Sequence, residues 1–227
     1  MQVPPLPDYP TVTIAGSAKR FPVHRIYCVG WNYAAHVREM GLSLERDLPV
    51  FFMKPLDAIV PSGGRVPYPP RTQSLHYEVE LVVAIGRAGA EIGVEDALEH
   101  VWGYGIGIDM TRRDLQIRAK ELRQPWETAK AFDHAAPLSA LHGTDEIGHP
   151  ASGRIWLAVN GELRQDGDLG QQIWTVPEIV QQLSSYFTLE PGDLIYTGTP
   201  AGVGAVERGD VLEGGIDDID TIRIEIV

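Results

Sequence analysis

The chain has 227 residues, of which 44% are hydrophobic and 22% are charged, values that are ordinary for a globular protein able to bury a full core. The 19 basic and 31 acidic residues give a formal net charge of −12, which disfavours binding to a nucleic-acid backbone or to an anionic lipid surface. A single cysteine excludes an internal disulfide framework and suits a reducing compartment, and no apolar run approaches the roughly 18 residues of a spanning helix. We therefore expect a cytoplasmic protein without a nucleic-acid or membrane partner.

Short strands separated by Gly/Pro turns dominate the pattern, with a few helices. Apolar runs predict strands at residues 11–16, 25–30, 57–63, 77–86, 101–110, 154–167, 192–200, 210–216 and 221–227. The Asn160-Gly161 pair predicts a type I′ hairpin turn. Helices are expected at 33–40, at 111–122 and after Thr175, where Thr175 and Glu178 fit a capping box. Residues 142–153 are interpreted as a polar surface loop, residues 1–20 as a short N-terminal extension, and residues 21–227 as a single domain.

Two glutamates, Glu78 and Glu80, lie two residues apart in the segment LHYEVELVVAIG, so both carboxylates leave the same face of the predicted strand. A solvated strand face is the commoner explanation for this spacing. The apolar run that follows predicts a strand covered on both faces, where a carboxylate is costly unless it is paired or bound to a metal. Asp109 ends the Gly-rich strand at 101–110 and could either cap the next helix or join the glutamates. Three carboxylates without nearby thiols would suit Mg²⁺ or Mn²⁺.

A histidine and a glutamate, His36 and Glu39, fall three residues apart on one face of the helix predicted at 33–40. They could be an exposed surface pair. A carboxylate beside an imidazole also raises its basicity and fixes its tautomer, as a general base for water activation requires. Cys28 lies in an apolar strand and is interpreted as a small buried hydrophobe rather than a nucleophile.

Seven segments, in this order along the chain, resemble the fumarylacetoacetate hydrolase superfamily and, more narrowly, its fumarylpyruvate hydrolase and acylpyruvase branch: NYAAHVREMG, MKP, HYEVELVVAIG, GYGIGIDMTRRDLQ, PWETAKAFDHAAP, VNGELRQDG and GDLIYTGTPAGVG. The resemblance runs from about Phe21 to the C-terminus. It implies a β-rich α+β fold, a β-roll or mixed β-sandwich with peripheral helices, which usually forms a homodimer.

The resemblance also implies roles for the residues already singled out. It makes Glu78, Glu80 and Asp109 the ligands of Mg²⁺, with Mn²⁺ as a possible substitute. It makes His36 and Glu39 a dyad that activates water, on a short helix that orders over bound substrate.

Four further positions match functional positions of the family. Lys130 matches its active-site lysine and is the candidate cation for a tetrahedral oxyanion. Arg113, Gln116 and Thr197 match substrate-contacting positions, although Arg113 could equally be a surface charge and Thr197 could belong to turn chemistry before Pro200.

The implied substrate is a small anionic 2,4-diketo acid, first of all 3-fumarylpyruvate, which would be cleaved to fumarate and pyruvate as in gentisate-type aromatic catabolism. The same kind of metal site also supports general acylpyruvase activity, isomerisation of a keto diacid, or decarboxylation of oxaloacetate, which needs no attacking water. A metal-stabilised dicarboxylate-binding protein without turnover is an alternative of another class, and a hydrolase that uses Cys28 is a further one.

Overall fold

The structure is a computed structural model that describes residues 9–41 and 48–227. The strands are β1 (Thr11–Thr13), β2 (Arg20–Pro22), β3 (Arg25–Gly30), β4 (Val50–Lys54), β5 (Ile59–Pro61), β6 (Arg65–Val66), β7 (Leu75–Tyr77), β8 (Val79–Ile85), β9 (Val101–Ile108), β10 (Thr111–Arg112), β11 (Ala136–Leu138), β12 (His142–Gly143), β13 (Arg154–Val159), β14 (Glu162–Asp168), β15 (Asp193–Tyr196), β16 (Gly204–Val206), β17 (Val211–Ile216) and β18 (Asp220–Ile226). The helices are α1 (Ala34–Glu39), α2 (Arg113–Glu121), α3 (Glu127–Lys130), α4 (Thr144–Ile147) and α5 (Val176–Ser184), with short 3-10 turns at Leu56–Ala58, Ala97–His100 and Leu169–Gln171.

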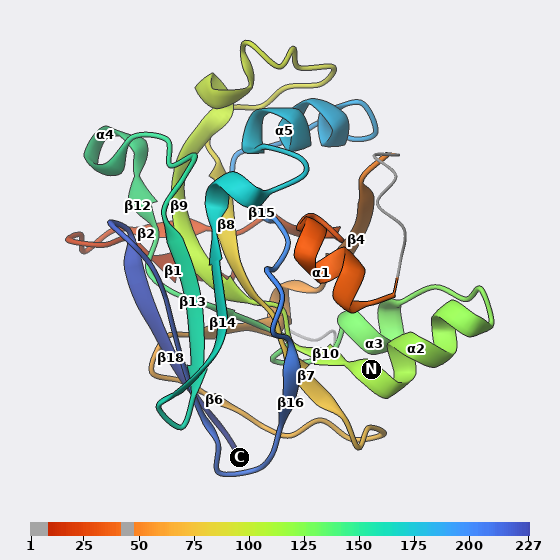
Figure 1. Cartoon of the computed structure of the whole chain (residues 1–227). Coiled ribbons are helices and arrows are strands. Elements are labelled where there is room, and N and C mark those ends of the chain that lie inside the picture. Colours follow the sequence, from red (N-terminus) through yellow and green to blue (C-terminus); the bar gives the residue numbers. More distant parts are fainter. Residues whose placement is uncertain (1–8, 42–47) are drawn as a thin grey trace, which may run out of the picture.

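Two sheets form the body of the molecule. The larger is a mixed sheet in the order β4-β3-β15-β8-β9-β11-β5, with β12 paired to β9, and the smaller has the order β14-β13-β17-β18-β6. Strands β13, β17 and β18 of the smaller sheet contact β8 and β9 of the larger one. The helices lie outside the sheets, with α5 at one end and α1, α2 and α3 together along one side (Figure 1). The predicted β-rich sandwich with peripheral helices is confirmed.

The core lies between these sheets and explains the apolar runs of the sequence. Every residue of β8 is buried, as expected of a strand covered on both faces. Strand β9 alternates glycine with larger residues because its neighbours approach closely: a Cβ atom on Gly107 would lie 2.2 Å from the Tyr196 ring. Gly107 therefore permits tight packing against β15, and Gly103 and Gly105 permit the close approach of residues 139–143.

Local sequence signals fix several of the connections. Asn160 and Gly161 both have positive φ (51° and 80°) between β13 and β14, as a type I′ turn requires. Helix α5 begins as predicted after Thr175, whose backbone N–H and hydroxyl both donate to the Glu178 carboxylate at 2.9 Å. In the described part of the chain no helix is long and apolar enough to cross a membrane.

Some elements differ from the predictions. The strand expected at 77–86 is interrupted at Glu78, which separates β7 from β8, and the strand expected at 192–200 ends at Tyr196. Residues 142–153 are not only a loop, since they contain β12 and α4. Strand β4 and helix α3 were not predicted, because each is too short to give a clear period.

Of the predicted N-terminal extension, residues 1–8 lie outside the described residues. The described remainder contains a hairpin of β1 and β2, and Ile14 bridges to Leu141. Val12 of this hairpin is buried. The division of the chain at residue 20 stays a prediction.

Candidate active site

Three carboxylates meet where β8 and β9 come together. Glu78 precedes β8, Glu80 lies within it, and Asp109 directly follows β9, whose end is fixed by a hydrogen bond of 2.8 Å from the Asp109 backbone N–H to the Glu78 carbonyl. One oxygen atom from each carboxylate lies within 4.8 Å of the others, and all three residues are buried. The strand spacing therefore predicted a real cluster. Asp109 does not cap the following helix, because α2 begins only at Arg113.

Lys130, at the end of α3, links two of these acids. Its Nζ donates to Glu78 Oε2 (2.7 Å), to Asp109 Oδ2 (2.5 Å) and to the Thr111 hydroxyl (2.7 Å). Burial alone would lower the pKa of Lys130, but the charges of Asp109 and Glu78 outweigh it and raise that pKa above its ordinary value. An ammonium group has three donors, and all three are used here. Donation to a substrate oxyanion would thus require Lys130 to exchange one bond, and among the described residues Thr111 is its one uncharged acceptor.

A second buried lysine, Lys54 of β4, was not among the predicted site residues. Its Nζ lies 2.8 Å from Asp109 Oδ1 and donates to the backbone carbonyls of Met110 (3.1 Å) and Lys130 (2.5 Å). The side chains of Lys54 and Asp109 are both fully buried. Lys54 therefore offsets the charge of Asp109 and joins β4 to the end of β9 and to the end of α3.

Glu78 is strongly held in its ionised form. Its Oε1 accepts a hydrogen bond from Arg113 Nη2, and its Oε2 accepts from Lys130. Burial opposes ionisation of this carboxyl, but the charges of Lys130 and Arg113 outweigh burial and lower the pKa of Glu78 well below its usual range.

Glu80, unlike Glu78, has no cationic side chain bound to it among the described residues, so its surroundings show whether a metal ion would fit. Its Oε2 accepts a hydrogen bond of 2.7 Å from the Gly198 backbone N–H, but it forms no ion pair with any described residue. Burial, and then the charges of Asp109 and Glu78, raise the pKa of Glu80 well above its ordinary value. A buried carboxylate that lacks a cation, beside two others, fits a hard divalent ion, and the donor set is all oxygen. Glu78, Glu80 and Asp109 are the residues that could hold it.

Gly198 places its N–H toward Glu80 because of an unusual backbone. Its φ is +96°, and a Cβ atom there would lie 2.6 Å from Asn32 Cβ. Asn32 in turn donates to the carbonyls of Trp174 (2.9 Å) and Thr197 (2.7 Å) and accepts from the Trp174 N–H (2.7 Å). These bonds anchor the start of α1 both to the segment before α5 and to the loop after β15.

His36 and Glu39 form the predicted pair on α1. His36 Nδ1 lies 3.1 Å from Glu39 Oε2, while Glu39 Oε1 accepts from the Gly202 N–H at 3.0 Å. His36 is buried and lines the same pocket as the three carboxylates. Because Glu39 holds the proton on Nδ1, the neutral imidazole keeps Nε2 as its acceptor. A surface pair is therefore excluded, and the structure brings the pair and the acids into one site.

Arg113 and Gln116 lie three residues apart on the buried face of α2. Arg113 Nη1 donates to Gln116 Oε1, and since a guanidinium can only donate, the amide nitrogen of Gln116 remains available for a ligand. Both side chains line the pocket and are almost fully buried, so Arg113 is not a surface charge.

Two predicted site residues do not line the pocket: Glu39, which reaches it through His36, and Thr197. The Thr197 hydroxyl donates to the Leu81 carbonyl (2.9 Å) and accepts from Gln172 Nε2 (2.8 Å), so it links three segments of the fold rather than facing a ligand. Thr199 lines the pocket instead, with its Oγ1 accepting from Gln165 Nε2 at 2.8 Å. The Thr199 hydroxyl proton thus remains for a ligand. Thr199 rather than Thr197 faces the pocket because the backbone turns at Gly198, which has a positive φ, and the sequence pattern does not show this turn.

The pocket that these residues share has an empty volume of about 310 Å³. Besides Val29 and Gly30, three aromatic residues line it, Trp31, Phe52 and Trp126, none of which was predicted as a site residue. The Trp31 and Trp126 rings meet edge to face at 5.2 Å, and Phe52 lies 5.9 Å from Trp126. They come from three separate segments, so no local pattern could have identified them.

Cys28 has no place in this chemistry. It is fully buried, and burial, followed by the charge of Asp109, raises the pKa of its thiol well above the ordinary value. The interpretation of Cys28 as a small hydrophobe in the core is confirmed, and a thiol nucleophile is excluded.

Comparison with known proteins agrees with this site. The family described as fumarylacetoacetate (FAA) hydrolase C-terminal matches residues 25–227. The chain belongs to the fumarylacetoacetate hydrolase family. Its fold resembles the crystal structure of fumarylpyruvate hydrolase from Pseudomonas aeruginosa in complex with Mn²⁺ and pyruvate, with a TM-score of 0.95 and 52% identity over 98% of this chain and 97% of that one.

Two curated relatives in the fumarylacetoacetate hydrolase family differ in activity. The mitochondrial oxaloacetate tautomerase FAHD1 of Rattus norvegicus is 44% identical over 201 residues, which are 88% of this chain and 90% of that protein. The fumarylpyruvate hydrolase of a Ralstonia species is 43% identical over 176 residues, which are 78% of this chain and 91% of that protein. The family is therefore shown, and the similar Pseudomonas aeruginosa structure holds Mn²⁺, whereas the relatives leave the substrate open between diketo acids and oxaloacetate.

Proposed function

We propose that this chain is a divalent-metal-dependent hydrolase that cleaves the carbon–carbon bond of a 2,4-diketo acid, with 3-fumarylpyruvate as the first candidate and Mg²⁺ as the ion, for which Mn²⁺ can substitute. The observation that carries this proposal is that His36, paired with Glu39 behind it, lines the same pocket as the Glu78, Glu80 and Asp109 carboxylates. A divalent ion held by those carboxylates would act as a Lewis acid toward the substrate's pyruvoyl oxygens.

The water-activating step belongs to the dyad. His36 Nε2 accepts a proton from water while Glu39 stabilises the imidazolium through Nδ1. The water oxygen attacks the distal carbonyl carbon, and the bond between that carbon and the methylene group breaks. Its electron pair passes to the pyruvoyl half, which takes up a proton to become pyruvate, while the acyl half leaves as a carboxylate.

The remaining residues hold the substrate. The Gln116 amide nitrogen and the Thr199 hydroxyl are donors that line the pocket. Lys130 pairs with Glu78 and Asp109, and we propose that it meets the oxyanion by releasing Thr111, the uncharged one of its three acceptors. Arg113 orients Gln116 and Glu78 together. The role in substrate contact that was predicted for Thr197 passes in this proposal to Thr199.

A second candidate is turnover of oxaloacetate, which the 44% identity to the rat oxaloacetate tautomerase favours. Decarboxylation of oxaloacetate needs no attacking water, so it would leave the His36–Glu39 pair without a hydrolytic task. A dicarboxylate-binding protein without turnover would have even less use for a buried, oriented base. The homodimer, the cytoplasmic location and the place in gentisate-type catabolism stay predictions.

A side-by-side assay separates these functions. Metal-stripped protein is given Mg²⁺ or none, and the loss of 3-fumarylpyruvate and the loss of oxaloacetate are followed with identification of the products. Rapid Mg²⁺-dependent release of fumarate and pyruvate, with slow oxaloacetate turnover, is the expected result. Fast oxaloacetate turnover without fumarylpyruvate cleavage would overturn the hydrolase proposal, and turnover of neither compound would favour a binding protein.

A further inference from the structure

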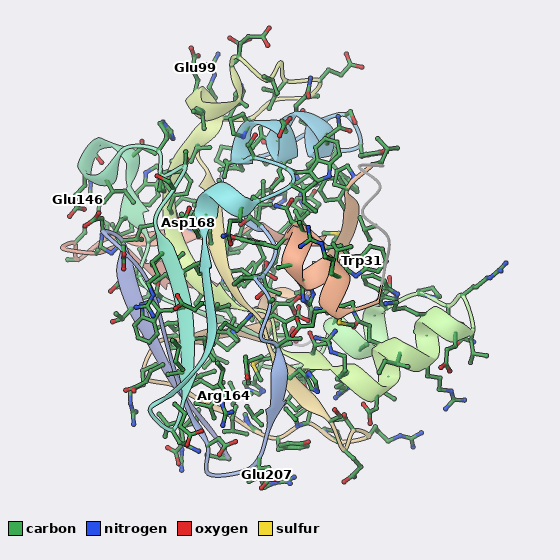
Figure 2. The ribbon with its side chains drawn as sticks, in the orientation of Figure 1. Trp31, Glu99, Glu146, Arg164, Asp168 and Glu207 are labelled. Carbon is green, nitrogen blue, oxygen red and sulfur yellow. The ribbon has the colours of Figure 1, made fainter. Side chains whose placement is uncertain are left out.

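The mouth of the pocket carries a feature that the proposed mechanism does not use. Trp31, at the pocket wall, has a φ of 59°, a left-handed conformation that is uncommon and unfavourable for a bulky residue. The neighbouring Asn32 side chain makes hydrogen bonds that over-determine this backbone. The Trp31 ring is thus held in a fixed place beside α1 (Figure 2).

A lysine of α2 lies against this ring. Lys120 Nζ is 5.2 Å from the centroid of the Trp31 ring. Lys120 follows Arg113 by seven residues and Gln116 by four, so the three share one face of α2, the face on which Arg113 and Gln116 line the pocket. Lys120 therefore extends the polar row of α2 outward from the catalytic centre.

The charge of Lys120 has no partner within the described part of the chain, where no carboxylate forms an ion pair with it. Burial and the nearby charge of Arg113 lower the pKa of Lys120 below its ordinary value. An anion bound beside Lys120 would offset both the loss of solvent and the repulsion from Arg113, whereas a neutral group would offset neither.

We propose that Lys120, held over Trp31, receives the distal carboxylate of the acyl group and selects dicarboxylic acylpyruvates over those with a neutral acyl group. This inference rests on the proposed function and adds to it the residue that chooses the substrate class. The flat aromatic wall of Trp31 and Trp126 suits the conjugated, planar acyl chain of such a substrate.

The lengths agree with this arrangement. Six carbon–carbon bonds separate the two carboxyl carbons of 3-fumarylpyruvate, an extended length of roughly 7–8 Å for bonds of about 1.5 Å. Arg113 binds Glu78 and so marks the carboxylate end of the pocket, where the pyruvoyl half would lie. Lys120 follows it by seven residues of helix, a rise of about 10 Å along the axis. The four-carbon stem of lysine can close the difference.

The test compares two substrates that differ at the distal end, 3-fumarylpyruvate and acetylpyruvate. Lys120→Met keeps the apolar stem over Trp31 and removes the charge, while Lys120→Arg keeps the charge. Arg118→Met is the matched control, since Arg118 lies on the same helix and is exposed. Lys120→Met should raise KM for fumarylpyruvate about tenfold with little change in kcat, and should change KM for acetylpyruvate less than about twofold. Lys120→Arg and Arg118→Met should remain close to wild type with both substrates.

An equal rise in KM for both substrates, or no rise for either, would overturn the role of Lys120. Wild-type protein that cleaves both substrates equally well would also overturn it, while leaving the hydrolase proposal intact. Wild-type protein that cleaves neither would refute the proposed function, and the inference about Lys120 would fall with it.

Discussion

The buried pair of Lys54 and Asp109 allows a quantitative prediction. Replacing Lys54 by Met leaves the Asp109 carboxylate with one cation fewer and removes a donor from the carbonyls of Met110 and Lys130. Removing one partner of a buried ion pair typically costs 3–5 kcal/mol. Asp109 keeps Lys130 on its other oxygen, which favours the low end of that range. We therefore expect Lys54→Met to lower the free energy of unfolding by about 3 kcal/mol.

Urea unfolding of metal-stripped protein at pH 7 measures this loss by linear extrapolation. Arg87→Met provides the control, because Arg87 pairs with Glu99 at the surface, where the two side chains are 64% and 67% exposed. The control should lose less than about 1 kcal/mol. If Lys54→Met is within about 1 kcal/mol of wild type, the reasoning about the buried pair is refuted.

Three further predictions concern the pocket and α2. His36→Gln should lower kcat for 3-fumarylpyruvate by roughly 10² to 10⁴ in a pyruvate-release assay, and an equal fall in oxaloacetate decarboxylation would contradict the water-activating role. Thr199→Val and Thr197→Val should each lower the free energy of unfolding by about 1 kcal/mol, because each removes the acceptor of one glutamine side chain, Gln165 or Gln172. Only Thr199→Val should also raise KM, since Thr199 lines the pocket and Thr197 does not; a raised KM in Thr197→Val with none in Thr199→Val would contradict these assignments. For Asp114, burial opposes ionisation, but hydrogen bonds from Thr72 and from backbone N–H groups outweigh it and lower its pKa below 3.8. The stabilisation by the ionised Asp114 carboxylate is present above pH 3.8 and is lost as the pH falls through the folded-state pKa. Asp114→Asn should therefore be less stable than wild type at pH 7 in thermal unfolding, and the difference should shrink below pH 3.8. A stability difference that does not change with pH would contradict this role of Asp114.

Two pairs of site residues could be predicted from a local period, whereas Asp109 was predicted from its place at a strand end, and Lys130, Arg113 and Gln116 from the family resemblance. Glu78 and Glu80 share a face because strand residues alternate, and His36 and Glu39 share one because helix residues three apart are neighbours. The run after Glu80 predicted burial of β8 on both faces, which the structure confirms. These inferences needed no knowledge of the tertiary structure.

Residues brought together by chain topology could not be predicted in this way. Lys54 reaches Asp109 only because β4 pairs with β3 at the edge of the larger sheet, and Trp31 meets Trp126 across almost a hundred residues of sequence. The choice of Thr199 over Thr197 depends on the positive φ of Gly198, which ends the alternation of β15. The periodicity of apolar residues in the sequence does not predict the Lys54–Asp109 contact, the Trp31–Trp126 contact or the turn at Gly198.

The central claim is that Glu78, Glu80 and Asp109 form a divalent-metal site, and binding of Mn²⁺ to the metal-stripped chain tests it most directly. The electron paramagnetic resonance signal of free Mn²⁺ gives the bound fraction for wild type, for Glu80→Gln, and for Glu99→Gln as an exposed control. Glu80→Gln conserves shape and removes a buried charge that has no cationic partner among the described residues, so it should fold. We expect one tight site per chain in wild type and in Glu99→Gln, and affinity lower by more than tenfold in Glu80→Gln. Equal Mn²⁺ binding by all three proteins would contradict the account.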